Sequence, residues 1–290
     1  MAIKIDGQDL LKKFIGWQEI VRIYKNGGEI RPNTVPPVLK PWLCFTANTA
    51  GSTLRLHKYW SPTVVSLEIS TDWETWTTYL FWTLITLSNI WDKIYWRNTS
   101  ETTTWFSTGW DHYEFFMNWS ISASWDVTSL INKNCTDTIL TDGSYYRLFH
   151  GCASLTTAPQ LPATTLTENC YLEMFRYCTS LTTAPQLPAT TLADGCYDGM
   201  FDHCESLETL PQLPATTLAD NCYSGMFYEC TSIKLSETQT WEYQTPYRIP
   251  ASWTWTVGAY SLDSMFLDTW WTWEGTPNIN QTYYTSNTVI

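Results

Sequence analysis

Residues 170–195 read CYLEMFRYCTSLTTAPQLPATTLADG, and residues 196–221 repeat them as CYDGMFDHCESLETLPQLPATTLADN. A third copy starts with CYSGMFYEC at Cys222. The same interval of 26 residues separates four phenylalanines, Phe149, Phe175, Phe201 and Phe227. A fixed period of this length with constant apolar positions indicates one small unit stacked on copies of itself, because a single unit cannot bury its own apolar side.

Each repeat contains two kinds of segment. In CYxxMFxxC the constant residues recur at spacings of three, one and three, which is one face of a short helix. The LTTAPQLP run is rich in Thr and Pro and indicates an extended segment with a bend. Asn169, Gly195 and Asn221 supply, before each helix, a residue that tolerates positive φ. One strand, one helix and one turn per coil predict a leucine-rich-repeat solenoid and a mixed α/β fold.

The apolar positions that keep the period are expected to form the repeat core. They are Phe149, Cys152, Leu155, Cys170, Phe175, Cys178, Leu181, Cys196, Phe201, Cys204, Leu207, Cys222, Phe227 and Cys230. Most of the cysteines fall in this register, which favours packing as thiols over a disulfide ladder. No CxxC pair is present, so we predict no metal site and no cofactor.

The motif MF-xx-C-x-SL-xx-A-P-x-LPATTLA-xx-CY resembles the BspA-like leucine-rich repeats of surface proteins from host-associated bacteria and of proteins from their phages. The resemblance covers residues 144–235. Upstream, LCFTANTAGSTLRLHKYWSP is similar to the β-rich domain that often precedes these repeats. Residues 1–33, with IKIDGQDL and NGGEIRP, are similar to short N-terminal modules of phage tail proteins. The resemblance implies a repeat protein that acts in adhesion and protein binding.

The residue patterns divide the chain into a small N-terminal attachment module, a Pro-rich linker, an antiparallel β-sandwich, the solenoid, and a degenerate repeat with a C-terminal cap. In that order the regions are residues 1–31, 32–41, 42–135, 136–235 and 236–290. In the first region IKIDG indicates a strand, QDLLKKFIG a short helix and EIVRIYKNGGEIRP a hairpin. The sandwich is predicted from short Thr-, Val-, Ile- and Tyr-rich runs with turn residues every 8 to 12 or so positions.

The charge of the chain restricts its partners. A formal net charge of −12, with 16 basic residues among 290, argues against binding to nucleic acid or to anionic lipid. No apolar run approaches the roughly 20 residues that span a bilayer, and the N-terminus MAIKIDGQDLLKK has no apolar core typical of a signal peptide. We therefore expect no membrane insertion. The resemblance to BspA-like surface proteins and phage proteins implies a place on a virion, outside the cell or at the cell surface.

Motifs of catalysis are missing from the sequence. There is no HExxH, GxSxG, GxxxxGK[ST] or Rossmann glycine pattern, so we predict that the protein is not an enzyme. The expected role is binding or display, as a phage virion component, tail- or fibre-associated, that recognises the host. Its partner would be a host-cell surface protein or glycan, and its N-terminal module would bind other virion or surface proteins. The alternative is a bacterial cell-surface adhesin of the BspA type, and neighbouring capsid and tail genes would favour the phage.

Partner contact is predicted at the polar positions of the extended segments. These are Thr156, Thr157, Gln160, Thr182, Thr183, Gln186, Glu208, Thr209 and Gln212. A row of such side chains on neighbouring repeats forms a continuous face that commonly binds partners. The competing interpretation is that these threonines only stabilise the ladder of strands.

The 18 tryptophans are concentrated at the two ends of the chain, with none between positions 126 and 240. Four of them stand where a turn favours glycine: Trp17, Trp73, Trp91 and Trp125. In one interpretation they are surface aromatics for ligand contact. In the other, UGA codons that mean glycine in the source organism have been translated as tryptophan. Trp76 and Trp96 lie inside strand-like runs, and both interpretations treat them as genuine tryptophans.

Overall fold

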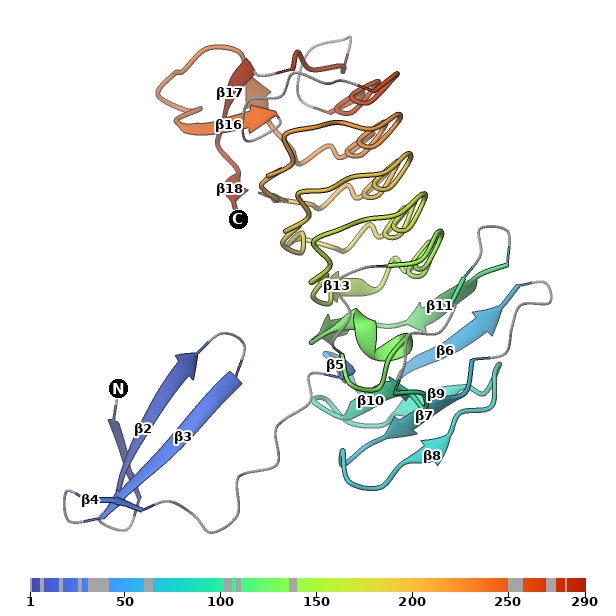
Figure 1. Ribbon diagram of the computed structural model, residues 1–290, viewed down its shortest axis with the longest axis vertical. Helices are drawn as coiled ribbons and strands as arrows, with labels where there is room; N and C mark the ends of the chain where they lie inside the picture. Colours follow the sequence, from blue (N-terminus) through green and yellow to red (C-terminus); the bar gives the residue numbers. More distant parts are fainter. Residues whose placement is uncertain are drawn as a thin grey trace. The chain divides into compact units, whose positions relative to one another are not determined.

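The computed structural model describes most of the chain (Figure 1). Backbone and side chains are described for residues 42–59, 65–101, 106–107, 111–135, 140–249, 258–269, 275–279 and 281–290, and the backbone for four strands nearer the N-terminus. The chain forms two compact units, residues 1–41 and residues 42–290. Each unit is described by itself.

The first unit is a four-stranded antiparallel sheet in the order β1-β2-β3-β4. Its strands are β1 (Ala2–Ile5), β2 (Gln8–Ile15), β3 (Gln18–Lys25) and β4 (Gly28–Ile30). The helix predicted for QDLLKKFIG is wrong, because this segment is β2. The strand pairs with β1 on one side and with β3 on the other, so its backbone hydrogen bonds go to neighbouring strands rather than along a helix. The predicted linker at 32–41 lies outside the described residues.

Two sheets open the second unit. The six-stranded sheet has the order β13-β12-β5-β10-β7-β8, and the three-stranded sheet the order β11-β6-β9. Their strands are β5 (Leu43–Ala47), β6 (Ser52–Lys58), β7 (Leu67–Ser70), β8 (Thr77–Thr78), β9 (Ile85–Leu87), β10 (Lys93–Asn98), β11 (Tyr113–Asn118), β12 (Ile121–Ser124) and β13 (Leu155–Thr157). All pairings are antiparallel except that of β12 with β13. Buried residues alternate along β10, as expected for a strand with one face in a core.

The two sheets pack face to face through aromatic side chains. Phe45 of β5 and Trp96 of β10 meet Phe115 of β11 with ring centroids 4.9 Å and 5.2 Å apart. Phe115 in turn stacks on Phe149 at 5.4 Å, and its N–H donates to the carbonyl of Leu148 at 2.8 Å. The sheets and the repeats therefore share one core.

The repeats form five turn runs, which lie above one another in Figure 1 from green to red. We use "turn run" for residues 142–152, 168–178, 194–204, 220–230 and 259–269. Within a run every second N–H bonds three residues back, as from Met174 to the carbonyl of Tyr171 at 3.2 Å. The intervening N–H groups bond to the next run, as from Phe175 to the carbonyl of Met200 at 2.9 Å. Backbone hydrogen bonds thus alternate between local turns and contacts along the stack.

The predicted fold class, a mixed α/β leucine-rich-repeat solenoid, is wrong. The described residues contain no α-helix, and their regular elements are strands apart from the 3-10 helix η1 (Val127–Leu130). The leucine-rich-repeat and solenoid assignments fall with it. The spacing of three, one and three comes from consecutive turns in which every fourth residue has positive φ, as at Asn169 (53°), Glu173 (51°) and Tyr177 (62°). An α-helix needs negative φ throughout and keeps its hydrogen bonds inside the segment.

Ladders of aromatic rings fill the turn runs. One ladder comprises Phe149, Phe175, Phe201, Phe227 and Phe266, with successive centroids 5.2–5.6 Å apart and ring planes within 13°. A second comprises Tyr145, Tyr171, Tyr197 and Tyr223 at 5.7 Å. The residues assigned to the repeat core are all buried. The nine cysteines are thiols, and the Sγ of Cys178 donates to the carbonyl of Phe149 at 3.1 Å.

The C-terminal residues return to the repeats. The strands here are β14 (Thr209–Leu210), β15 (Leu235–Ser236), β16 (Thr245–Ile249), β17 (Gln281–Thr285) and β18 (Thr288–Val289). β17 lies between β15 and β16, while β18 pairs in parallel with β14. Ile290 closes this pairing, because its N–H donates to Leu210 at 3.0 Å and its carbonyl accepts from Gln212 at 2.9 Å. No helix of the described residues is long and apolar enough to cross a membrane.

Candidate functional site: a polar cavity

A row of polar side chains follows the extended segments of the repeats. In each repeat a buried leucine or isoleucine comes directly before the polar residues of the row. Leu181, for example, is fully buried, while Thr182 and Thr183 are exposed. Adjacent repeats are tied together here by the parallel bridge between Thr157 and Thr183 and by the hydrogen bond from the Glu208 N–H to the Thr182 carbonyl at 2.9 Å. The backbone under the row is therefore fixed, and most of its side chains face solvent, although Thr209 is buried.

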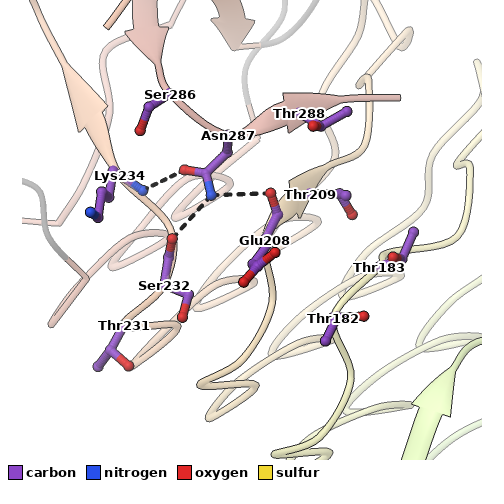
Figure 2. Close-up of a pocket in the computed structure, with 10 residues that line it drawn as sticks. All are labelled: Thr182, Thr183, Glu208, Thr209, Thr231, Ser232, Lys234, Ser286, Asn287 and Thr288. Atoms are coloured by element: carbon purple, nitrogen blue, oxygen red, sulfur yellow. Dashed lines mark hydrogen bonds between the residues drawn. The ribbon is translucent and has the colours of Figure 1, made fainter. Parts of the chain in front are cut away.

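The row leads into a pocket of about 480 Å³ that is open to solvent, which we call the cavity (Figure 2). Its walls come from two repeats, from the segment before β15 and from the C-terminal segment. The lining residues are Thr182, Thr183, Glu208, Thr209, Thr231, Ser232, Lys234, Ser286, Asn287 and Thr288. Seven of them carry a hydroxyl group, and one acidic, one basic and one amide side chain complete the set.

Three of these residues occupy the same position in successive repeats. Thr182, Glu208 and Lys234 stand 26 residues apart and therefore come to one side of the cavity. Hydroxyl, carboxylate and ammonium groups follow each other there. The cavity thus offers donors, acceptors and both signs of charge within a single wall.

Asn287 fixes the C-terminal wall against the repeats. Its Nδ2 donates to the carbonyls of Glu208 at 3.1 Å and Ser232 at 3.0 Å, and its Oδ1 accepts from the Lys234 N–H at 2.8 Å (Figure 2). The Thr285 hydroxyl adds a bond to the Lys234 carbonyl at 2.6 Å. Because these bonds satisfy backbone groups that would otherwise pair with a neighbouring strand, the segment stays in place and keeps the cavity open.

The structure brings some of the predicted partner-binding residues together and separates others. Thr182, Thr183, Glu208 and Thr209 line the cavity, although the Thr209 hydroxyl already accepts from the Ala184 N–H at 2.6 Å. The predicted residues that are exposed outside its lining are Thr157, Gln160, Gln186 and Gln212.

Thr156 has an internal role. Its hydroxyl accepts from Asn48 at 2.9 Å and lies 3.0 Å from the hydroxyl of Ser122, where it ties the repeats to the sheets.

Sequence reasoning missed six lining residues. Thr231, Ser232 and Lys234 could have been found, because they continue the repeat positions of Glu205, Ser206 and Glu208. The stretch from Ser286 to Thr288 carries no repeat signal, since it reaches the cavity only through the pairing of β18 with β14.

Ion pairs connect the turn runs. Arg147 contacts Glu173 at 2.5 Å, Glu173 contacts Arg176 at 2.6 Å, and Arg176 reaches Asp202 at 2.9 Å. Burial acts to raise the pKa of Glu173, but the hydrogen bond and charge of Arg147, with the charge of Arg176, outweigh it and lower that pKa. Asp198, by contrast, is raised to a pKa of about 6 by burial and by the charge of Glu173. The ion pairs of Arg147, Glu173, Arg176 and Asp202 thus connect successive turn runs, whereas the ionised Asp198 has no such benefit.

Comparisons with protein-family models, with curated proteins and with solved structures give no match. In the part of the chain that the structure describes, no three His, Cys, Asp or Glu side chains are placed to hold a metal ion. The cavity is thus the feature from which a function can be argued.

Proposed function

We propose that the chain is a non-enzymatic recognition protein of a phage virion, tail- or fibre-associated, whose polar cavity binds a glycan of the host-cell surface. The observation that carries the proposal is the cavity itself, with seven hydroxyl-bearing side chains, five on the stacked repeats and two on the C-terminal segment. The protein acts on the virion surface, outside the host cell.

The size and chemistry of the cavity favour a sugar. A volume of about 480 Å³ falls in the range of small-ligand sites, roughly 300–1,000 Å³. Hydroxyl groups both donate and accept hydrogen bonds, as do those of a sugar, while Glu208 and Lys234 provide an acceptor and a donor of fixed charge. A net charge of −12 disfavours nucleic acid as the competing ligand.

The first unit would attach the protein to other virion proteins. Its sheet has β1 and β4 at the edges. An edge strand presents backbone N–H and C=O groups that can pair with a strand of another chain. The cavity is lined by residues of the second unit alone, so attachment and ligand binding would use different residues.

A glycan array tests the ligand. The full chain is expected to bind a subset of bacterial surface glycans, and Glu208→Ala and Lys234→Ala are expected to weaken that binding about tenfold, because each removes one charged hydrogen-bonding group. Gln186→Ala, on the same row but outside the cavity lining, is the matched control. Binding that both cavity variants leave intact would contradict the proposal.

The location on a virion needs a separate test. An antibody to the full chain is expected to label the tail or fibres of purified particles, and capsid and tail genes are expected beside its gene. Absence of the protein from particles that carry a complete tail would contradict the location on a virion. It would not contradict the proposal that the cavity binds a glycan.

A further inference from the structure

Five tryptophans have a backbone conformation that normally belongs to glycine. Their φ angles lie between 61° and 74°, at Trp73, Trp82, Trp91, Trp119 and Trp125. All five are exposed, by 39% to 72% of their surface. A bulky residue at positive φ places its Cβ too close to the backbone, at a cost of about 1–2 kcal/mol, whereas glycine has no Cβ and no such cost.

Hydrogen bonds define the turn type at two of these positions. The Thr83 N–H donates to the Leu80 carbonyl at 3.1 Å, which places Trp82 third in a four-residue turn. The Asp92 N–H likewise donates to the Asn89 carbonyl at 3.2 Å, with Trp91 third. Positive φ at the third residue and not at the second is the type II turn, which requires glycine or asparagine there.

Two of the other positions, Trp73 and Trp125, are held by their surroundings. Asp72 accepts hydrogen bonds from the N–H groups of Glu74 and Thr75, at 3.0 Å and 2.7 Å, so the loop closes around Trp73. The carbonyl of Trp125 accepts from the Gln160 N–H at 2.7 Å, which ties that backbone to the first repeat. The indole of neither residue is buried by these contacts.

The remaining residues give an internal comparison. Among the described residues of 42–135, positive φ occurs at Gly51, at the five tryptophans and at Cys135. In the turn runs positive φ also occurs at two tyrosines, Tyr177 and Tyr260, but at no Leu, Ile, Val, Met or Phe of the described residues. One repeat position with positive φ is occupied in turn by Arg147, Glu173, Gly199 and Gly225, so glycine recurs where the chain samples this conformation.

Three other tryptophans, Trp42, Trp76 and Trp96, are buried or make ring contacts typical of tryptophan. Trp96 is fully buried between the sheets. Trp42 donates from Nε1 to the Lys133 carbonyl at 3.0 Å and packs edge-on against Trp76 at 4.8 Å, while Arg97 lies over the Trp76 ring at 3.8 Å. None of the three has positive φ.

We infer that glycine occupies positions 73, 82, 91, 119 and 125 in the protein as its source organism makes it. The sequence composition agrees, because residues 42–134 contain two glycines and eleven tryptophans although they are rich in turns. The codon that connects the two amino acids is UGA, read as glycine by the source and as tryptophan in the printed sequence. The exposed indoles are therefore not a sugar-stacking surface, and the polar cavity remains the site for a ligand.

The first test reads the codons and the protein. UGA is expected at the five positions and UGG at 42, 76 and 96, and tandem mass spectrometry of the protein from its natural source is expected to give glycine at 73, 82, 91, 119 and 125. UGG at the five positions, or tryptophan in those peptides, overturns the inference. Neither result depends on whether the cavity binds a glycan.

The second test measures stability in full chains made from synthetic genes. The chain with glycine at all five positions is expected to melt roughly 10 °C above the chain with tryptophan, because each replacement relieves backbone strain. The matched control, Trp96→Gly, is expected to lower Tm, since it empties a core position. A Tm that falls when the five exposed tryptophans are replaced overturns the inference.

Discussion

Asp198 shows how a single carboxylate links pH to stability. Burial and the charge of Glu173 raise its pKa from 3.8 to about 6 in the folded protein, so the folded state holds the proton more tightly than the unfolded state. Its stabilising effect is complete below the unfolded pKa and is lost as the pH rises through about 6. Replacement by a neutral amide removes this loss.

Asp198→Asn is therefore expected to increase the free energy of unfolding at pH 7.5 by about 1 kcal/mol, after allowance for solvent screening of a partly exposed group. At pH 4 the change should be close to zero. Urea unfolding at both pH values measures the difference, with the exposed Glu205→Gln as the control. Equal effects at pH 4 and pH 7.5 would show that Asp198 does not titrate as described.

The thiols of the repeat core are expected to be inert. Burial raises the pKa of Cys178, Cys204 and Cys230 well above the ordinary value, and the thiolate is the reactive form. A maleimide reagent should label the half-exposed Cys135 in the native protein and the three repeat thiols only after unfolding. Native labelling at Cys204 would contradict the packing.

Single residues were predictable where the period repeats them. The buried positions of Phe175, Cys178 and Leu181 follow from their spacing alone, because each recurs in every copy. Asn287 was not predictable, since its role comes from three backbone groups far away in the sequence.

At the scale of elements, the turn run explains why the helix prediction failed. The spacing of apolar residues is the same for a short helix and for consecutive turns, so the sequence pattern does not separate them. What separates them is the destination of the N–H groups, and half of these bond to the next run. These hydrogen bonds between runs can form only when neighbouring repeats are stacked, so the pattern of a single repeat does not reveal them.

The phenylalanine ladder should carry much of the stability of the stack. Phe201 is fully buried between Phe175 and Phe227, so Phe201→Ala is expected to reduce the free energy of unfolding by about 3–5 kcal/mol. Gln186→Ala, exposed on the row, should change it by less than about 0.5 kcal/mol. Denaturant unfolding compares the two, and similar small losses for both would argue against a packed ladder.

Asn287 should determine whether the C-terminal segment holds its place. Asn287→Ala leaves two carbonyls and one N–H without their partner, at an expected cost of about 1–3 kcal/mol, and should weaken ligand binding because a wall of the cavity loosens. Gln186→Ala, exposed and outside the cavity lining, is the control. The Tm of the variant is measured by calorimetry, together with its ligand affinity. An unchanged Tm would show that Asn287 does not anchor the C-terminal segment.

At the scale of the whole molecule, the sheets and the repeats of residues 42–290 should unfold together. Phe115 of β11 continues the ladder that begins at Phe149, and β13 of the first repeat belongs to the six-stranded sheet. Phe115→Ala and Phe201→Ala are therefore expected to lower the same calorimetric transition. Separate transitions, each shifted by one of the two variants, would indicate independent domains.

The arrangement of the molecule was only partly predictable. Strand-rich residues between 42 and 130 and a periodic stack after them follow from alternation and spacing. The shared core does not, because it depends on Phe115 meeting Phe149 across a region where the sequence pattern changes. The cavity depends in the same way on β18 returning to β14.

The most direct test of the recognition role compares two equivalent threonines. Thr183 lines the cavity, whereas Thr157 stands at the same position one repeat earlier, also exposed but outside it. Adsorption of the full chain to host cells is measured for Thr183→Arg and Thr157→Arg. Thr183→Arg is expected to fill the cavity and to lower the affinity by about tenfold or more, while Thr157→Arg is expected to change it less than about twofold. Equal affinities for the two variants would contradict it.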